Sequence, residues 1–215
     1  MLPNGYRSEK VNAKSNFADR LQGAGAYVNR QGIFRSRDMV AAGFPREYLR
    51  RLVNRGRVRR ISRGLYAPAG FDGDQHQSLV ELGQRVPRGV VCLLSALQFH
   101  GIGTQSPREV WLALPRGSRR PRVANQALHC CLFSGAAQAF GIERHSLRGG
   151  EVRVYSAAKT VADCFKYRHK VGLDVAIEAL REGWRERKFS MMELSAAAAV
   201  CRVSRVMQPY LEMLT

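Results

Sequence analysis

Short apolar clusters separated by glycine-containing turns dominate the first part of the chain. Apolar residues recur at helical spacing over residues 17–28, although Gly23 and Gly25 weaken the helix that they predict. A shorter helix is expected to follow Ser36, which we assign as its N-cap, and to stop at Gly43. The pattern therefore predicts two helices before a tight turn.

A third helix and a hairpin are predicted after this turn. Pro45 suits the first position of a helix, and Gly56 suits its end. Residues 58–61 and 65–67 have the pattern of two short strands joined through residues 62–64. Two helices around a glycine turn, followed by a hairpin, predict a winged helix-turn-helix.

Residues beyond this module have a different pattern. The polar, turn-prone segment Phe71-Asp72-Gly73-Asp74 predicts a domain boundary, which divides the chain into residues 1–70 and residues 71–215. The strands expected in the second part lie at residues 109–114, 128–133 and 152–155. The helices expected there lie at residues 76–86, 95–100, 157–167 and 173–187, and after a capping box at residues 190–193. The predicted fold class is α+β, with an N-terminal winged helix-turn-helix followed by a mixed α/β domain whose C-terminal third is helical.

The helix expected at residues 173–187 has one apolar stripe. Leu173, Ile177, Leu180 and Trp184 recur on it at helical spacing. Because an amphipathic helix buries its apolar face, we expect disruption of this stripe to unfold the second domain in part.

The charge of the chain comes mainly from arginine. A total of 35 Lys and Arg against 17 Asp and Glu gives a net charge of +18, and residues 1–70 hold 15 of the basic and 4 of the acidic side chains. Such an excess points to a polyanionic partner, and the planar guanidinium suits contacts to phosphate and to guanine edges. Because arginine content can also follow a GC-rich genome, the placement of the arginines is more informative than their number.

The helix that begins at Pro45 has two opposed faces. Its apolar side chains cluster on one side. The polar side chains on the opposite side are Glu47, Arg50, Arg51 and Asn54, with Arg46 beside them. Arginine and asparagine carry the donors that read guanine and adenine edges in the major groove, so we predict that Arg46, Arg50, Arg51 and Asn54 read bases.

Arginines continue from this helix into the hairpin. Residues 45–63 contain eight arginines and a single acid. An isolated basic helix is usually a solvated surface, but a continuous cationic run over helix and wing favours DNA binding. We predict that the later arginines hold phosphates or probe the minor groove; these are Arg55, Arg57, Arg59, Arg60 and Arg63.

Several segments resemble the AbiEi antitoxin family. The winged-helix part of the likeness is the run Leu52-Val-Asn-Arg-Gly-Arg-Val-Arg-Arg-Ile-Ser-Arg-Gly-Leu-Tyr66. Further along, Leu94-Ser-Ala-Leu97, His100-Gly-Ile102, Tyr155-Ser-Ala-Ala-Lys-Thr-Val-Ala-Asp-Cys-Phe-Lys166 and Val171-Gly-Leu-Asp-Val-Ala-Ile-Glu-Ala-Leu180 are also similar to the family. The similarity covers nearly the whole chain after residue 15.

The resemblance implies a component of a type IV toxin-antitoxin system. Such a protein represses its own operon by binding an operator in double-stranded DNA, for which an inverted repeat is one arrangement, and it counters a nucleotidyltransferase-like toxin. Direct contact with the toxin is left open. The alternatives are a solitary transcriptional regulator and a nucleic-acid-processing enzyme targeted by its winged helix.

Enzymatic patterns have simpler explanations in this sequence. Ser156-Ala-Ala-Lys159 formally matches an acyl-serine motif, but we expect Ser156 to be a helix N-cap. Glu186-Arg-Lys188 formally matches a nuclease core, but it lies at the end of a predicted helix. We therefore predict no catalysis, no metal and no cofactor. The enzyme alternative would need acids distant along the chain to converge, such as Asp72, Asp74, Glu109 and Asp163.

The remaining features concern location and secondary contacts. The five cysteines show no C-x-x-C pair, and the absence of a long apolar run or a signal segment favours the cytoplasm and no membrane partner. Two further basic clusters, at Arg116–Arg122 and Lys166–Lys170, are either solvated loops or contacts to DNA or to an acidic partner.

Overall fold

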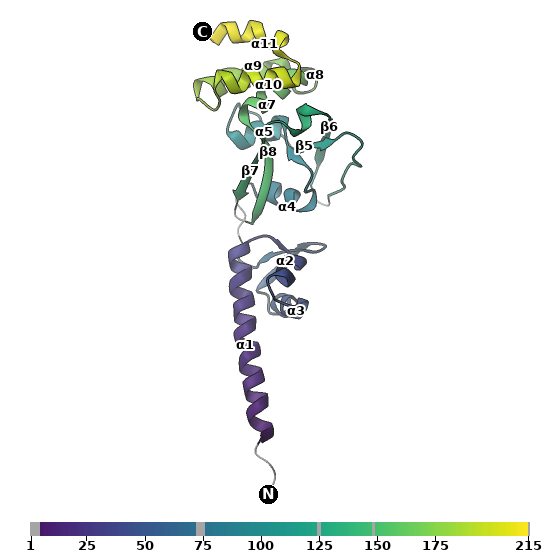
Figure 1. Cartoon of the computed structure of the whole chain (residues 1–215), viewed down its shortest axis with the longest axis vertical. Helices are drawn as coiled ribbons and strands as arrows, with labels where there is room; N and C mark the ends of the chain where they lie inside the picture. Colours follow the sequence, from purple (N-terminus) through teal and green to yellow (C-terminus); the bar gives the residue numbers. More distant parts are fainter. Residues whose placement is uncertain (1–4, 72–75, 124–125, 148, 215) are drawn as a thin grey trace. The chain divides into compact units, whose positions relative to one another are not determined.

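The computed structural model describes residues 5–71, 76–123, 126–147 and 149–214. The chain divides into two compact units (Figure 1). Unit 1 comprises Met1–Gln77 together with Arg148–Gly150, and unit 2 comprises Ser78–Leu147 and Glu151–Thr215. That residues 1–70 and 71–215 act as separate functional domains stays a prediction.

Unit 1 is a winged helix-turn-helix. Its elements are α1 (Gly5–Gln31), β1 (Phe34–Arg35), α2 (Ser36–Ala41), α3 (Arg46–Asn54), β2 (Val58–Ser62) and β3 (Leu65–Pro68). The three strands form an antiparallel sheet in the order β1-β3-β2. The predicted N-terminal fold is confirmed, with β2 and β3 as the wing.

The turns of this module follow from a few residues. Gly43 and Gly56 both have a positive φ, which a residue without a Cβ adopts at little cost. After α3 the N–H of Arg57 donates to the carbonyl of Leu52 at 2.9 Å, and the N–H of Gly56 donates to that of Val53 at 2.9 Å. This Schellman arrangement satisfies the last carbonyls of α3 and sends the chain into the wing.

The helix starts in unit 1 differ from the prediction by one residue. Arg35, not Ser36, is the N-cap of α2, because its backbone N–H donates to the Asp38 carboxylate at 2.9 Å. Pro45 is likewise the N-cap of α3 and not its first helical residue. Each shift is a single residue and leaves the predicted helix in place.

The first helix is much longer than predicted, since α1 spans Gly5–Gln31 and continues through Gly23 and Gly25. Tertiary packing accounts for its C-terminal half, where Leu21, Ala24 and Val28 are buried. They join a core whose other members are Phe34, Met39, Tyr48, Leu49, Leu52 and Val58. This core packs α3 against α1, and both helices are labelled in Figure 1.

Unit 2 combines a five-stranded sheet with helices. Its strands have the order β6-β5-β4-β8-β7 and are β4 (Val90–Val91), β5 (Val110–Pro115), β6 (Leu128–Phe133), β7 (Ile142–Leu147) and β8 (Gly150–Tyr155). Its longer helices are α4 (Gln77–Arg85), α5 (Leu93–His100), α7 (Ala157–Lys166), α9 (Leu173–Arg185), α10 (Met191–Cys201) and α11 (Ser204–Leu211). The short helices α6 (Ala136–Ala139) and α8 (Arg168–Val171), and a final 3-10 turn at Glu212–Leu214, complete it. The predicted mixed domain with a helical C-terminal third is confirmed.

Helix α7 is the centre of unit 2. It packs against α5, α9, α10 and α11, and every residue from Ala157 to Phe165 is buried. Ser156 caps it as predicted, since its hydroxyl accepts from the N–H of Lys159 at 3.3 Å. A helix buried on all sides is normally apolar, so the charged residues inside α7 need a separate explanation.

The apolar stripe predicted on α9 is not its buried face. Leu180 is fully buried, but Leu173 is 38% exposed, and Ile177 and Trp184 are only partly buried. The small residues of α9 face the core instead, together with Val175 and Leu180; these are Ala176, Ala179 and Gly183. Close packing against α7 requires small side chains, which a stripe of large residues does not reveal.

Candidate nucleic-acid interface

The two faces of α3 are those that the sequence predicts. Tyr48, Leu49 and Leu52 are buried against the rest of unit 1. The exposed side chains of the helix are Arg46, Glu47, Arg50, Arg51 and Asn54. Burial of the apolar face therefore holds a row of hydrogen-bond donors at the surface.

An open groove of about 620 Å³ lies between α3 and the wing. We call it the α3 groove; the residues that line it are Ser36, Arg46, Leu49, Arg50, Val53, Asn54, Arg60, Arg63 and Tyr66. The structure thus brings Arg46, Arg50 and Asn54 of α3 together with Arg60 and Arg63 of the wing. No acidic residue is among the described residues that line the groove, so this lining is strongly cationic.

Arg51 lies outside the α3 groove. Its guanidinium donates to Glu47 at 2.6 and 3.1 Å and lies 4.3 Å from the centre of the Phe17 ring. Phe17 in turn stacks on Tyr48 with ring centres 5.0 Å apart. The sequence analysis grouped Arg51 with the residues predicted to read bases. In the structure its guanidinium contacts Phe17 of α1 and Glu47 of α3 instead.

The arginines of the wing also divide into two groups. Arg60 lines the α3 groove, whereas Arg59 points elsewhere and donates to the carbonyl of Phe71 at 3.3 Å. Neighbouring residues of a strand point to opposite faces, which explains the difference. Arg55 and Arg57 are exposed in the turn after α3 and do not line the groove.

Two groove residues that can form hydrogen bonds through their side chains, Ser36 and Tyr66, were missed by the sequence reasoning. Ser36 lies at the first position of α2, and Tyr66 lies on β3 opposite Arg60 in the strand register. Residues directly opposite each other in an antiparallel pair share a face of the sheet. The register of the predicted hairpin could therefore have identified Tyr66 as a neighbour of Arg60.

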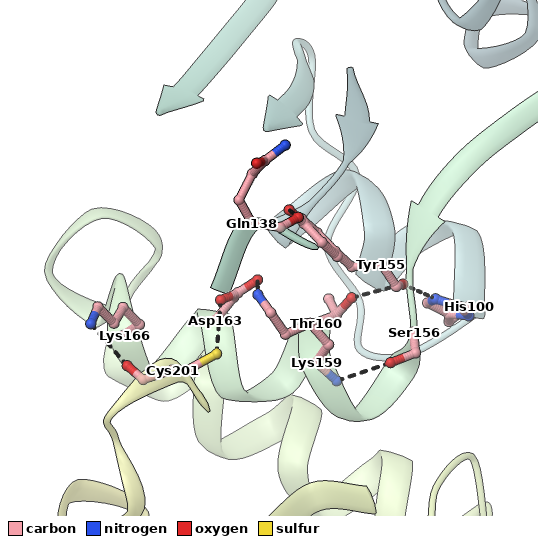
Figure 2. A network of polar contacts seen from close by, with 9 residues as sticks. All are labelled: His100, Gln138, Tyr155, Ser156, Lys159, Thr160, Asp163, Lys166 and Cys201. Carbon is pink, nitrogen blue, oxygen red and sulfur yellow. Dashed lines mark hydrogen bonds and ion pairs between the residues drawn. The ribbon is translucent and has the colours of Figure 1, made fainter. Parts of the chain in front are cut away.

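Helix α7 of unit 2 contains a buried ion pair between Lys159 and Asp163 (Figure 2). The Nζ of Lys159 lies 2.5 Å from Oδ2 of Asp163, with the two side chains 0% and 2% exposed. The thiol of Cys201 donates to Oδ1 of Asp163 at 3.3 Å, and the Lys159 ammonium lies 4.3 Å from the centre of the Tyr155 ring. Burial raises the pKa of Asp163, and the Lys159 charge partly offsets this effect.

The enzymatic patterns do not assemble into a metal site. Glu109 lies 3.6 Å from His129 at the surface, while Asp163 is in the core with Lys159. Asp72 and Asp74 lie outside the described residues. Within the part of the chain that the structure describes, no group of three or more His, Cys, Asp and Glu side chains could hold a metal ion.

The second predicted basic cluster is partly structural. Lys166 donates to the carbonyl of Cys201 at 2.8 Å, and Arg168 donates to that of Phe165 at 3.0 Å. The Lys170 ammonium lies 5.5 Å from the centre of the Tyr167 ring. In the first cluster Arg116, Arg119, Arg120 and Arg122 are all exposed.

Comparison with known proteins finds a family that matches unit 1. Residues 27–69, which span most of the helix-turn-helix and its wing, match the family described as transcriptional regulator, AbiEi antitoxin. The resemblance to the AbiEi antitoxins is confirmed over these residues, and the likeness of the later segments stays a prediction. That family is one of transcriptional regulators, a class that is typically not enzymatic.

The whole-chain comparisons add information on the fold. No curated protein sequence matches the chain. The crystal structure of the RV2827C protein from Mycobacterium tuberculosis superposes with a TM-score of 0.57 at 14% identity, over 88% of this chain and 75% of that one. At this identity the likeness shows the fold alone. Among the described residues, no helix is both long enough and apolar enough to cross a membrane.

Proposed function

We propose that this protein is a sequence-specific DNA-binding antitoxin of the cytoplasm. It represses its own toxin-antitoxin operon and counters a nucleotidyltransferase-like toxin. The α3 groove carries this proposal, because donors from the second helix of a helix-turn-helix and cations from the wing line one groove, whose described lining residues include no acid. The match of residues 27–69 to AbiEi regulators supports the biological role.

Bases and phosphates meet different parts of the groove in this proposal. Arg46, Arg50 and Asn54 extend from α3, the element that enters the major groove in helix-turn-helix proteins. Arg60 and Arg63 lie on the wing beside them and contact the sugar-phosphate backbone or the adjacent minor groove. Arg55 and Arg57 are exposed beyond the end of α3, where they add phosphate contacts.

The proposal includes no catalysis by this chain. Ser156 is a helix cap, and Lys159, its partner in the acyl-serine motif, is fully buried in an ion pair. Glu186 and Lys188 follow the end of α9 and pair with each other at 3.4 Å. Both enzyme-like patterns are therefore accounted for by local structure.

Base reading is tested with three variants of α3. Arg50→Ala and Asn54→Ala are expected to weaken binding to the operator by about 1–3 kcal/mol and to relax base preference, because each removes a base-edge donor. Arg51→Ala is the matched control, since its guanidinium is engaged by Glu47 and Phe17 outside the groove. The measurement is fluorescence anisotropy with DNA from upstream of the gene and with shuffled DNA. A larger loss of specificity for Arg51→Ala than for Arg50→Ala would reject the assignment.

Phosphate contacts are tested by the salt dependence of binding. Arg60→Ala and Arg63→Ala are each expected to weaken binding to all DNA sequences alike and to flatten the slope of log affinity against log salt by roughly 0.9. Arg59→Ala should change the slope less, because that guanidinium donates to the Phe71 carbonyl away from the groove. Equal slope changes for Arg59→Ala and Arg60→Ala would show that phosphate contacts are not confined to arginines that line the α3 groove.

A further inference from the structure

Unit 2 contains a pocket of about 460 Å³ beside the buried ion pair of α7. We call it the Asp163 pocket. Its walls come from the end of β6, the segment that leads into α6, the end of α7 and the end of α10. The volume falls within the range of small-molecule sites, and both polar and apolar residues line the pocket.

The Asp163 carboxylate is the acceptor of this pocket. Oδ2 accepts from Lys159 and Oδ1 accepts from the thiol of Cys201, and Figure 2 shows both contacts. A carboxylate has about four lone-pair sites, so further donors can bind to the same group. Burying an ion pair seldom gains stability over apolar packing, so stability alone does not explain why this pair lies beside a pocket.

Two cations at the pocket complement this acceptor. Lys166 lies one turn after Asp163 on α7, and the carbonyl of Cys201 holds its Nζ in place at 2.8 Å. Arg202 lies at the end of α10, and its side chain is exposed. The pocket therefore joins a buried carboxylate to two cationic side chains, which suits a ligand that carries an anion and hydroxyl donors together.

The backbone at Arg202 supports a role for its side chain. This residue ends α10 in the left-handed conformation, with φ 59°, and the N–H of Val203 donates to the carbonyl of Ala198 at 2.9 Å. Glycine is the usual residue at such a position because a Cβ is disfavoured there. An arginine at this position therefore lowers the stability of the helix end, but it places a cationic residue in the lining of the pocket.

We propose that the Asp163 pocket binds a phosphate monoester of a sugar or nucleoside. Lys166 and Arg202 bind the phosphate, and Asp163 accepts from a ribose-type hydroxyl. The exposed side chain of Leu132 and the Tyr167 ring give the ligand an apolar wall. The pocket lies wholly within unit 2 and is distinct from the α3 groove.

Calorimetry on the full chain tests this proposal with ribose 5-phosphate, adenosine monophosphate and inorganic phosphate. We expect both esters to bind at least tenfold more tightly than inorganic phosphate, because only they reach the carboxylate as well as the cations. Arg202→Gly is expected to weaken ester binding at least tenfold while the melting temperature stays equal or rises, since glycine suits the left-handed position. If Arg202 had only a structural role, its replacement would not weaken ester binding while leaving the melting temperature equal or higher.

Arg205→Ala is the matched control for charge. Arg205 is exposed on α11, three residues from Arg202, but it does not line the pocket. Its variant should bind the esters as the wild type does. Failure of the wild-type protein to bind either ester at millimolar concentration, equal affinity for ester and inorganic phosphate, or unchanged binding by Arg202→Gly would each overturn the proposal.

Discussion

Asp163→Ala is expected to destabilise unit 2 by about 3–5 kcal/mol. The substitution leaves the Lys159 ammonium fully buried without its counter-charge and removes the acceptor of the Cys201 thiol. A buried charge that loses its partner keeps its full desolvation penalty, and this is the reason for the large effect. Both tryptophans of the chain, Trp111 and Trp184, lie in unit 2, so urea unfolding followed by their fluorescence measures this loss.

Two further variants separate the burial of the pair from its charge. Replacing both partners, as Lys159→Met with Asp163→Leu, should recover part of the stability that Asp163→Ala loses, because no charge is then left unpaired. Glu186→Ala removes one partner of an exposed pair with Lys188 and should cost less than about 1 kcal/mol. If Asp163→Ala and Glu186→Ala lower the free energy of unfolding by similar amounts, the buried pair is no more important for stability than the exposed one.

The local patterns of the sequence were sufficient to predict the winged helix-turn-helix. Gly43 and Gly56 mark turns that the backbone needs in a left-handed conformation, and the apolar face of α3 is set by helical periodicity alone. The hairpin follows from two short strands around Gly64, which also has a positive φ. Because these signals act within a few residues, they predict α2, α3 and the wing almost to the residue.

Elements that depend on distant partners were harder to predict. β7 lies at the edge of its sheet and has apolar residues only at its two ends, Ile142 and Leu147, and β1 is only two residues long. The buried face of α9 consists largely of Ala176, Ala179 and Gly183, which a search for large apolar residues overlooks. The missed strands and the missed helix face have the same cause. Where the local pattern is weak, tertiary contacts decide whether a strand forms and which face of a helix is buried.

The candidate DNA-binding residues divide in the same way. Their exposure follows from periodicity, and all nine of them are exposed. Their directions do not follow from it, because Arg51 is engaged by Phe17 of α1 and Arg59 by the carbonyl of Phe71. Arg46, Arg50, Asn54, Arg60 and Arg63 remain together in the α3 groove. The sequence could identify the surface, and the structure narrows the set proposed to read DNA.

Repression and neutralisation of the toxin are expected to be separable between the two units. Cells that express the toxin from an unrelated promoter should survive when they also express an Arg50→Ala/Asn54→Ala variant. This variant lacks two side chains of the α3 groove that we propose to contact bases, but repression does not act on toxin that has already been made. Unit 2 also contains residues 155–180, the run whose sequence we compared with the family above, outside the winged helix-turn-helix. Cell survival with the two genes on independent promoters is the measurement.

Disruption of unit 2 is expected to abolish this protection. Leu180→Asp places a charge at a fully buried position of α9 and should unfold the unit, because an unpaired buried charge costs more than a small domain can offset. Leu173→Asp is the matched control, since the same change occurs on the same helix at a side chain that is 38% exposed. Circular dichroism on each purified variant establishes which of them are folded. Loss of protection in a folded Arg50→Ala/Asn54→Ala variant would show instead that neutralisation requires DNA binding, and full protection by an unfolded Leu180→Asp variant would remove unit 2 from the mechanism.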